Sequence, residues 1–275
     1  QSSLASSIYL SLFLNAYLIL FLKIYHYIKL PFIFVLEKQK YYKGNFKVPK
    51  VFYFKNTSSG LYSFSMEYIS GQKLSDYIST ADMDSIDLIS QKFKSIIIEH
   101  DIYDNEANIK IKTKIKELQK KIQTNKSKYK KELETPFNLL EKFDWKYCVS
   151  SDCHGDLTLE NILIKERELY VIDLLDSFYD SWLIDIAKIF QDLECLWSYR
   201  NYDKIDDNLR ARLSILKERL CDDIISIKNG RQTLITIYHF LLLNLLRILP
   251  YTKEESTEKY IYFEIKNIIE IIKKI

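Results

Sequence analysis

The sequence is poor in cysteine, proline and glycine. Its 275 residues include four cysteines, four prolines and five glycines. The cysteines, at positions 148, 153, 195 and 221, show no C-x-x-C or metal-finger spacing. This pattern does not match a zinc finger, and it favours reduced thiols in a cytoplasmic protein over a disulfide framework.

Neither sign of charge predominates. The 40 Lys and Arg residues against 37 Asp and Glu residues leave a formal net charge of +3. So small an excess argues against nucleic acid as an obligate partner. A chain of this length can bury a sizeable core and is expected to form one two-lobed unit or two small domains.

The apolar run near the start of the sequence is shorter than a membrane-spanning helix. Residues 8–22 are apolar except for Ser11, Asn15 and the tyrosine hydroxyls, and Lys23 then ends the run. A spanning helix needs about 20 residues. We predict two buried strands around a turn at Asn15, with a membrane anchor or signal segment as the alternative.

Residues that carry chemistry gather in HGDLTLENILIKERELYVIDLLD, residues 154–176. Phosphoryl transfer from a nucleotide needs a carboxylate that orients the attacking hydroxyl and takes its proton, and oxygen ligands for Mg²⁺. Asp156 and Asn161 are five apart, the spacing of Asp and Asn in the loop pattern H-R-D-L-x-x-x-N, with Gly155 replacing the arginine. The pattern predicts phosphoryl transfer rather than a chance surface loop.

Two short apolar runs follow, NILI and LYVID, separated by the charged turn KERE. They predict a β-hairpin that brings Asp173 back beside Asn161, although the two are twelve residues apart in the sequence. An amide oxygen and a carboxylate on adjacent strands suit Mg²⁺, which takes its other ligands from water and phosphates.

The segment resembles the Brenner-type motif of aminoglycoside phosphotransferases and their relatives, the choline, homoserine, fructosamine and hexosamine kinases. That motif runs close to HGDLHxxNILV, then IDW or IDF, then a D-x-x-x-D-[LI]-A helix. Here the third piece is DSWLIDIAK, residues 180–188, and the resemblance extends from about Lys23 onward. The stretch IDLLDSFYDSWLIDIAKIFQDLECLWSYR is more narrowly similar to a group of bacterial phosphotransferase-like proteins.

The resemblance implies an α+β, protein-kinase-like fold with two lobes. Residues 1–68 would form a small β-rich, nucleotide-binding N-lobe, and residues 69–275 a helical C-lobe with the catalytic hairpin and the acceptor site. The implied reaction uses ATP and Mg²⁺ to phosphorylate a hydroxyl of a small molecule such as a sugar, an amino alcohol or an aminoglycoside-like compound. A nucleotide-binding module without turnover and a membrane-attached protein are the alternatives.

The same resemblance implies roles for individual residues. Asp156 would be the catalytic base, and Asn161 and Asp173 the Mg²⁺ ligands. His154 would brace the loop, and Asp185 would be a buried carboxylate that holds the loop by its backbone amides. At positions 158 and 160, Thr and Glu stand where related kinases often have His, Pro or Gly, so the acceptor side of the pocket is expected to differ.

A second motif, YSFSMEYISGQKLSDYI at residues 62–78, begins as an alternating strand and breaks at Gly71 before a short helix. In the implied fold it is the last N-lobe strand and the hinge, where backbone groups read adenine. Met66 would lie at the back of the adenine pocket. The hinge candidates are Glu67, Tyr68 and Ile69. An edge strand followed by a turn is the alternative.

The upstream segment supplies the remaining N-lobe candidates. Residues 47–54 predict a strand, and residues 34–42 a helix carrying Glu37. Lys23 would be the lysine that contacts phosphate and pairs with Glu37, or alternatively a solvated lysine at a strand end. Because the sequence begins without a strand before SSLASS, at residues 2–7, we expect a truncated lobe whose phosphate loop carries serine in place of glycine, or a disordered start.

The rest of the C-lobe is predicted to be helical. The first expected helix is capped by Asp82 or Asp84 and runs to about residue 100. The others are residues 106–131, 203–228 (ended by Asn229 and Gly230), 232–249 and 257–275. The second of the five is rich in lysine, which predicts a helix face exposed to solvent; a surface that binds an anionic partner is the alternative. Because this helix lies between the hinge and the catalytic loop in the sequence, it is also placed to shape the acceptor pocket. The fourth is apolar nearly all round and predicts a buried core helix.

Overall fold

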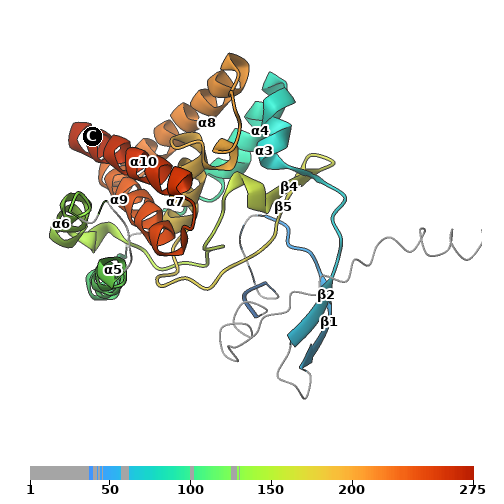
Figure 1. The fold of residues 1–275 in the computed structure, drawn as a ribbon. Helices are drawn as coiled ribbons and strands as arrows, with labels where there is room; N and C mark the ends of the chain where they lie inside the picture. Colours follow the sequence, from blue (N-terminus) through green and yellow to red (C-terminus); the bar gives the residue numbers. More distant parts are fainter. Residues whose placement is uncertain are drawn as a thin grey trace, which may run out of the picture.

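The computed structural model describes residues 37–39, 42, 44, 46–56, 62–99, 102–124, 129 and 131–275. Most of this part of the chain forms a helical body, and a two-stranded hairpin projects from one side of it (Figure 1). Lys23, the apolar run at residues 8–22 and the SSLASS segment lie outside the described residues.

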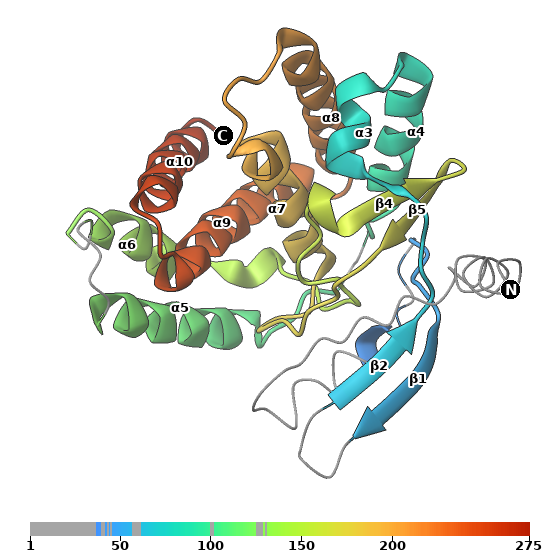
Figure 2. The same cartoon turned by 45° about the vertical axis from the view of Figure 1, so that its right-hand side comes forward.

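The projecting hairpin consists of β1 (Val51–Asn56) and β2 (Tyr62–Met66), which pair antiparallel (Figure 2). β1 begins four residues later than predicted. Pro49 has no N–H to give to a strand partner, and Lys47 pairs elsewhere: its N–H donates to Leu169 O at 3.0 Å, and its carbonyl accepts from Val171 N–H at 2.8 Å. The segment before β1 therefore ties the hairpin to the helical body. Residues 37–39 are helical, within the predicted 34–42.

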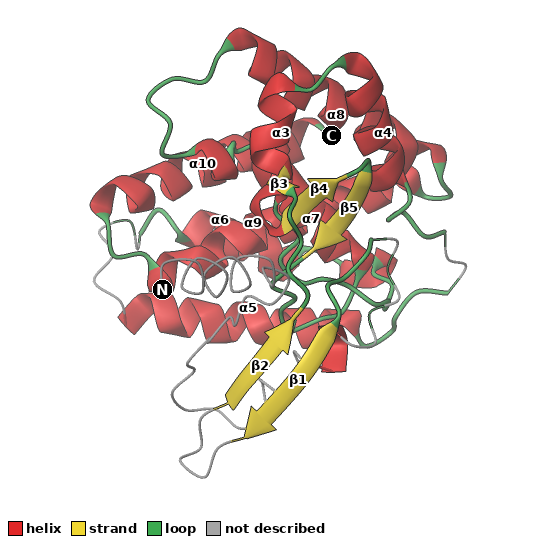
Figure 3. Ribbon diagram, turned by 90° about the vertical axis from the view of Figure 1, so that its right-hand side faces the viewer, coloured by secondary structure: helices red, strands yellow, loops and turns green. Residues whose placement is uncertain are grey.

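The second sheet holds the predicted catalytic hairpin. Its strands are β3 (Gln72–Lys73), β4 (Ile162–Lys165) and β5 (Glu168–Val171), antiparallel in the order β3-β4-β5 (Figure 3). Glu166 and Arg167 join β4 to β5 with φ of 51° and 65°, the conformation of a two-residue turn that matches strand twist. Ile162 faces Val171 in the register. The predicted hairpin is confirmed, and the residues just outside this pair, Asn161 and Ile172, end up adjacent.

The helices occur in the predicted order, with some shifted ends and with one helix, Glu134–Lys142, that was not predicted. They are α3 (Leu74–Thr80), α4 (Met83–Lys94), α5 (Ala107–Thr124), α6 (Glu134–Lys142), α7 (Trp182–Leu193), α8 (Asp207–Ser226), α9 (Gly230–Ile248) and α10 (Glu255–Lys274). Short 3-10 turns occur at Trp145–Tyr147, Leu159–Asn161, Trp197–Tyr199 and Leu249–Tyr251.

Three predicted helix boundaries differ from those in the structure. α4 begins after Asp82, whose carboxylate accepts from Ser85 N–H at 2.8 Å, but it ends at Lys94 rather than near 100. The N–H of Ser95 closes that last turn on Gln91 O at 3.1 Å. The lysine-rich helix stops at Thr124 rather than 131. Gly230 was expected to end α8, but it is the first residue of α9, after Asn229 in a left-handed conformation (φ 57°).

The core lies around α9, which contacts α7, α8 and α10 and is crossed on another side by α5 (Figure 2). The prediction of a buried core helix is confirmed, since most of α9 is buried. In the described part of the chain, the segment Gly230–Tyr251 has the length and apolar composition of a membrane span, but 78% of its most apolar window is buried inside the protein. Such burial is typical of a core helix.

Candidate active site

α7 holds the start of the 154–161 loop through a buried carboxylate. Asp185 accepts hydrogen bonds from His154 N–H (2.7 Å) and Gly155 N–H (2.9 Å), one to each carboxylate oxygen. The side chain is 2% exposed. Burial raises the pKa of Asp185 to about 7, although the two amide hydrogen bonds act to lower it. The predicted loop-holding contact of Asp185 is therefore present.

A second carboxylate of α7, which the sequence reasoning missed, holds the other end of the loop. Asp192 accepts from Leu159 N–H at 2.6 Å and from Ser198 N–H at 2.7 Å. Asp192 follows Asp185 by two helical turns, so both lie on one face of α7. Burial raises the pKa of Asp192 to about 6, against the lowering effect of these hydrogen bonds. The loop is thus fixed at both ends to a single rigid element.

Between these carboxylates, Lys188 points at the loop's own aspartate. Its Nζ lies 2.9 Å from Asp156 Oδ1, and the residue is only 8% exposed. Burial raises the pKa of Asp156, but the Lys188 ammonium outweighs it, so the net shift is downward and the carboxylate is ionised at neutral pH. Lys188 stands three residues after Asp185 and four before Asp192, and this helical spacing is the signal in the sequence that could have found it.

The structure brings Asn161 and Asp173 together. Ile172 N–H donates to Asn161 O at 3.0 Å, which places Asp173 one residue past the contact. Asn161 Nδ2 donates to the backbone oxygen of Asp156 (2.8 Å) and to its Oδ2 (3.3 Å). Since the amide nitrogen is used in this way, the Asn161 Oδ1 atom is the group left for a cation.

Asp173 is exposed and has a left-handed backbone with φ of 59°. Such a conformation is uncommon outside glycine, and Asp is one of the residues that tolerate it. A backbone held in this region is typical of sites where geometry serves function. One carboxylate and one amide oxygen at the open end of a hairpin fit a hard cation that completes its shell with water and phosphate oxygens.

His154 links the loop to the end of β5. Its Nε2 lies 2.8 Å from Ile172 O, and its Nδ1 lies 3.2 Å from Asp156 N–H. The backbone N–H requires an unprotonated Nδ1, so the proton is on Nε2. Burial lowers the pKa of His154 to about 4. The imidazole is therefore neutral at pH 7, as a structural brace requires.

Two glycines allow close approach of backbones in this region. Gly155 has a φ of 88°, and a Cβ placed on it would lie 2.7 Å from Leu175 O. A Cβ at Gly71 would lie 2.8 Å from Ile164 O in β4. A side chain at either position would force the backbones apart. Gly155 thus lets the loop pass the segment after β5, and Gly71 lets the segment that leads into β3 approach β4.

The hinge candidates lie where β2 leaves the projecting hairpin. Met66 ends β2, and its Sδ accepts from Gln39 Nε2 at 3.5 Å. Glu67 N–H donates to Lys50 O at 2.7 Å, so this backbone group is already in use. Ile69 is buried, whereas Tyr68 is 41% exposed. The structure thus places all four between the two sheets.

The predicted pair of Lys23 and Glu37 stays a prediction, since Lys23 lies outside the described residues and Glu37 is exposed. The neighbouring Lys38 makes a contact that was not foreseen. Its Nζ pairs with Asp180 Oδ1 at 2.9 Å and donates to Leu175 O at 2.9 Å. The helical segment at residues 37–39 is thereby tied to the stretch that follows Asp173.

Cys153, next to the loop, is fully buried and contacts Asp180. Burial raises the pKa of its thiol, which is the opposite of what a nucleophilic cysteine needs. Its contacts are those of a packing residue.

A cavity of about 470 Å³ opens beside Asp156. Residues of the loop side (Gly155, Asp156, Leu175 and Lys188) form one part of its wall. α5, the end of α9 and the following turn form the other: Lys114, Glu117, Leu118, Lys121, Asn244, Arg247, Ile248 and Tyr251. This volume is within the range of small-molecule sites.

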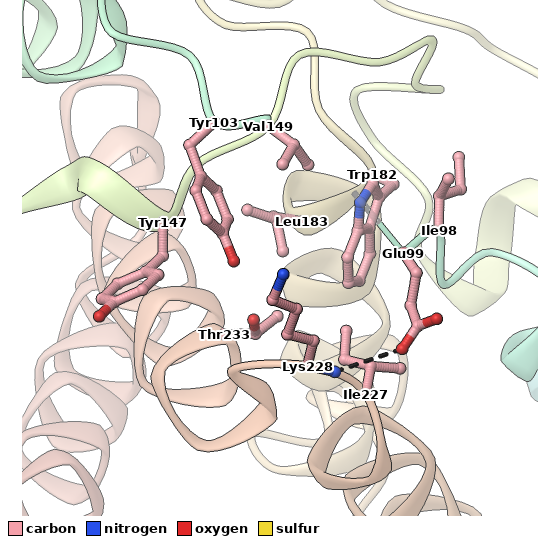
Figure 4. A pocket seen from close by; sticks show the side chains of 10 residues that line it. All are labelled: Ile98, Glu99, Tyr103, Tyr147, Val149, Trp182, Leu183, Ile227, Lys228 and Thr233. Atoms are coloured by element: carbon pink, nitrogen blue, oxygen red, sulfur yellow. Dashed lines mark hydrogen bonds between the residues drawn. The ribbon is translucent and has the colours of Figure 1, made fainter. Parts of the chain in front are cut away.

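Two other cavities are smaller. One of about 290 Å³ lies around Lys38, Cys153 and Asp180. The other, about 20 Å³, lies between Tyr103, Trp182 and Lys228, where Lys228 N–H donates to Glu99 Oε1 at 3.2 Å (Figure 4). A space of that size holds about one water molecule. The 470 Å³ cavity beside Asp156 is thus the roomiest of the three.

No family model and no curated protein sequence matches the chain. Solved structures do. The GDP complex of wild-type aminoglycoside 2'-phosphotransferase-IIIa is similar with a TM-score of 0.52 and 16% identity over 88% of this chain and 80% of that one. The apo form of a thermostable mutant of aminoglycoside phosphotransferase APH(4)-Ia is similar with a TM-score of 0.55 and 12% identity, over 86% of this chain and 83% of that one.

The GDP and kanamycin complex of an APH(2'') phosphotransferase of type IIIa gives a TM-score of 0.51 and 14% identity, over 84% of this chain and 76% of that one. At such identities the likeness concerns the fold. The two-lobed, protein-kinase-like fold of the aminoglycoside phosphotransferases, which the sequence motifs predicted, is therefore the fold of this chain.

Proposed function

We propose that the protein is a small-molecule kinase that transfers the γ-phosphoryl group of ATP to a hydroxyl of its acceptor. The observation that carries the proposal is Asp156. This ionised carboxylate lines a cavity of about 470 Å³, and the loop that bears it is fixed by Asp185 and Asp192 of one helix. Fixed positioning is what phosphoryl transfer demands of a protein.

In this proposal residues 1–68 bind the nucleotide and residues 69–275 supply the catalytic loop and the acceptor site. The backbone of the segment formed by Glu67, Tyr68 and Ile69 contacts the adenine ring, with Met66 behind it. Lys23, paired with Glu37, contacts the phosphates. The hinge assignment rests on the position of residues 66–69 at the end of β2 and before β3. The assignment of Lys23 and Glu37 rests on the sequence resemblance alone.

Asp156 performs the proton transfer. The acceptor oxygen attacks the γ-phosphorus, the bond from that phosphorus to the bridging oxygen of ADP breaks, and the hydroxyl proton passes to the Asp156 carboxylate. His154 and Asn161 hold the loop backbone and the carboxylate in place through their bonds to Asp156. Lys188 keeps Asp156 ionised before the reaction.

Asn161 and Asp173 would hold Mg²⁺. The ion would neutralise the phosphate charge of the bound nucleotide. Asn161 contributes Oδ1, because its Nδ2 is committed to Asp156. Asp173 contributes the carboxylate that follows the β4–β5 hairpin.

The experiment that tests this function is the loss of the metal ligand in Asp173→Ala. Since removal of weaker, outer-shell contacts already costs metal sites 10- to 100-fold in affinity, loss of the carboxylate is expected to weaken Mg·ATP binding at least about tenfold. Isothermal calorimetry measures the affinity. Asp176→Ala, an exposed aspartate three residues further on, is the control and should bind like the wild type.

Unchanged Mg·ATP affinity in a folded Asp173→Ala protein would refute the metal assignment. Labelled ATP incubated with pooled sugars, amino alcohols and aminoglycosides then tests turnover. Tight nucleotide binding without transfer to any member of the pools would favour the alternative, a nucleotide-binding module.

Lys188 acts as a positioning residue, and its loss should change the pH dependence of the reaction. In Lys188→Met the burial of Asp156 is no longer opposed by the ammonium, so the carboxyl pKa rises. The acidic limb of the profile of kcat/KM against pH is expected to move to higher pH, whereas Lys188→Arg, which keeps the charge, should leave it near its original place. An unmoved limb in Lys188→Met would show that the ion pair does not set the pKa.

A further inference from the structure

The cavity beside Asp156 is lined by more cationic than anionic side chains. The basic ones are Lys114, Lys121, Lys188 and Arg247, and the acidic ones are Glu117 and Asp156. Lys114 and Lys121 come from α5, the lysine-rich helix, which lies against α9 (Figure 2). Its basic face therefore borders the acceptor cavity as well as solvent.

Two of these cations are neutralised within the cavity wall. Lys114 pairs with Glu117 at 3.5 Å, and Lys188 pairs with Asp156 at 2.9 Å. The other two, Lys121 and Arg247, form no ion pair with a carboxylate of the described chain. Lys121 instead donates to the Tyr251 hydroxyl at 2.8 Å and lies 4.1 Å from the centre of its ring. Two positive charges on the side of the cavity away from α7 thus have no ion-pair partner among the described carboxylates.

Arg247 is partly buried at the end of α9. Its guanidinium donates to Asn244 Oδ1 at 3.1 Å and lies 4.9 Å from the centre of the Phe178 ring. Burial lowers the pKa of Arg247, although Asp156 acts to raise it. A guanidinium removed from water without an anionic partner is costly. An anion bound in the cavity would offset that cost.

Asn244, which also lines the cavity, supplies a second and independent indication of a ligand. It is 1% exposed, and its Nδ2 has no hydrogen-bond partner among the described residues. The Arg247 guanidinium can only donate, so it fixes the Asn244 oxygen towards itself and leaves the amide nitrogen as an unused donor. Buried polar groups in native proteins normally have partners. The groups without partners here are hydrogen-bond donors, so a ligand that carries hydrogen-bond acceptors would satisfy them.

We propose that the acceptor of this kinase is a hydroxyl-bearing anion, whose carboxylate or phosphate group binds Arg247, Lys121 and Asn244 while its hydroxyl faces Asp156. This inference rests on the proposed function and narrows its substrate class. A guanidinium matches the planar oxygens of such groups with two parallel hydrogen bonds. The excess positive charge of the wall disfavours polycations, and therefore amine-rich sugars such as kanamycin.

The test uses sugars of one size and different charge. Glucuronate and glucose 6-phosphate are the anionic probes, glucose the neutral one and glucosamine the cationic one, with kanamycin as a polycation and inorganic phosphate and acetate as minimal anions. Calorimetry in the presence of Mg·ADP gives their affinities without requiring turnover. We expect anions to bind at least about tenfold more tightly than the neutral and cationic sugars, with the ranking of glucuronate and glucose 6-phosphate distinguishing a carboxylate site from a phosphate site.

Variants of the cavity residues test which of them bind the anions. Arg247→Met should weaken anion binding about 10- to 100-fold, and Arg247→Lys should restore part of it. Lys121→Met, on an exposed part of α5, should weaken anion binding by a smaller factor. It provides the test if the Arg247→Met protein does not fold. Mg·ATP affinity should be unchanged in each. Lys116→Met, an exposed lysine of α5 outside the cavity wall, is the matched control.

Equal binding of anions and cations, no binding of any anionic probe, or an anion preference that survives in both Arg247→Met and Lys121→Met would overturn the inference. Its failure is distinguishable from failure of the proposed function. Normal Mg·ATP binding through Asp173 with no anion preference would refute the acceptor class alone. Anion binding at Arg247 in a protein that does not bind Mg·ATP would refute the kinase and leave an anion site.

Discussion

Asp156→Asn is expected to reduce turnover by about 10²- to 10⁴-fold, the usual contribution of a positioned general base. The amide keeps the size of the side chain and can still hydrogen-bond an acceptor hydroxyl, but it cannot take the proton. It also loses the ion pair with Lys188. Because Asn161 and Asp173 remain, Mg·ATP affinity should stay within a few-fold of the wild type.

Turnover is measured with labelled ATP, either with an acceptor found by the screen or as slow hydrolysis of ATP in its absence. Asp152→Asn, an exposed aspartate four residues earlier in the same segment, is the control and should be fully active. If Asp156→Asn turned over as fast as the wild type, the carboxylate would not be the base. The nucleotide-binding module would then be the better description of the protein.

The second large effect concerns stability. Asp185→Ala removes the acceptor of two buried N–H groups, those of His154 and Gly155. Each unsatisfied donor costs about 1–3 kcal/mol, so we expect a loss of about 2–6 kcal/mol in the free energy of unfolding. Urea denaturation measures it. Asp222→Ala, an exposed aspartate on α8, is the control and should change stability by less than about 0.5 kcal/mol. A loss in Asp185→Ala no larger than that of the control would refute the anchoring role.

The same carboxyl should make stability depend on pH in a defined direction. Its pKa is about 7 in the folded protein, against about 4 for an unfolded aspartate. Between these values the folded state binds more protons than the unfolded state, so the contribution of Asp185 to stability falls as pH rises. The stability advantage of the wild type over Asp185→Asn is therefore expected to shrink from pH 5 to pH 8.

Comparison with Asp185→Asn is necessary because other groups titrate in the same range. His154 and His239 have pKa values lowered to about 4 by burial, and their contributions rise with pH. They are common to both proteins and cancel in the difference. An advantage that did not change between pH 5 and pH 8 would mean that Asp185 is ionised in the folded state throughout this range, and would contradict the raised pKa.

The local order of the site followed from the sequence. The spacing of Asp156 and Asn161, and the two apolar runs with a charged turn between them, sufficed to predict the hairpin and the position of Asp173. Hairpin pairing is a short-range matter, decided by alternation of side chains and by the turn, and both can be read from neighbouring residues. The buried character of α9 was equally predictable, because its apolar residues cover nearly the whole circumference of the helix.

Helix and strand ends were less predictable, since they depend on partners distant in the sequence. β1 starts late because Lys47 pairs with β5. The three side chains of α7 that hold the loop are spaced regularly, but which loop atoms they meet is set by packing alone. Asp192 and Lys188 were therefore missed as site residues, while Asp185 was identified through a family motif.

By itself the sequence determined the chemistry of the loop: a carboxylate, an amide and a second carboxylate at spacings that a hairpin turns into one site. Only the tertiary structure decided what faces that site. Lys114 and Lys121 stand more than thirty residues before Asp156, and Arg247 some ninety after it, so no local pattern joins them. They meet because α5 and the end of α9 pack around the same space. The charge of the cavity beside Asp156 is a property of that packing.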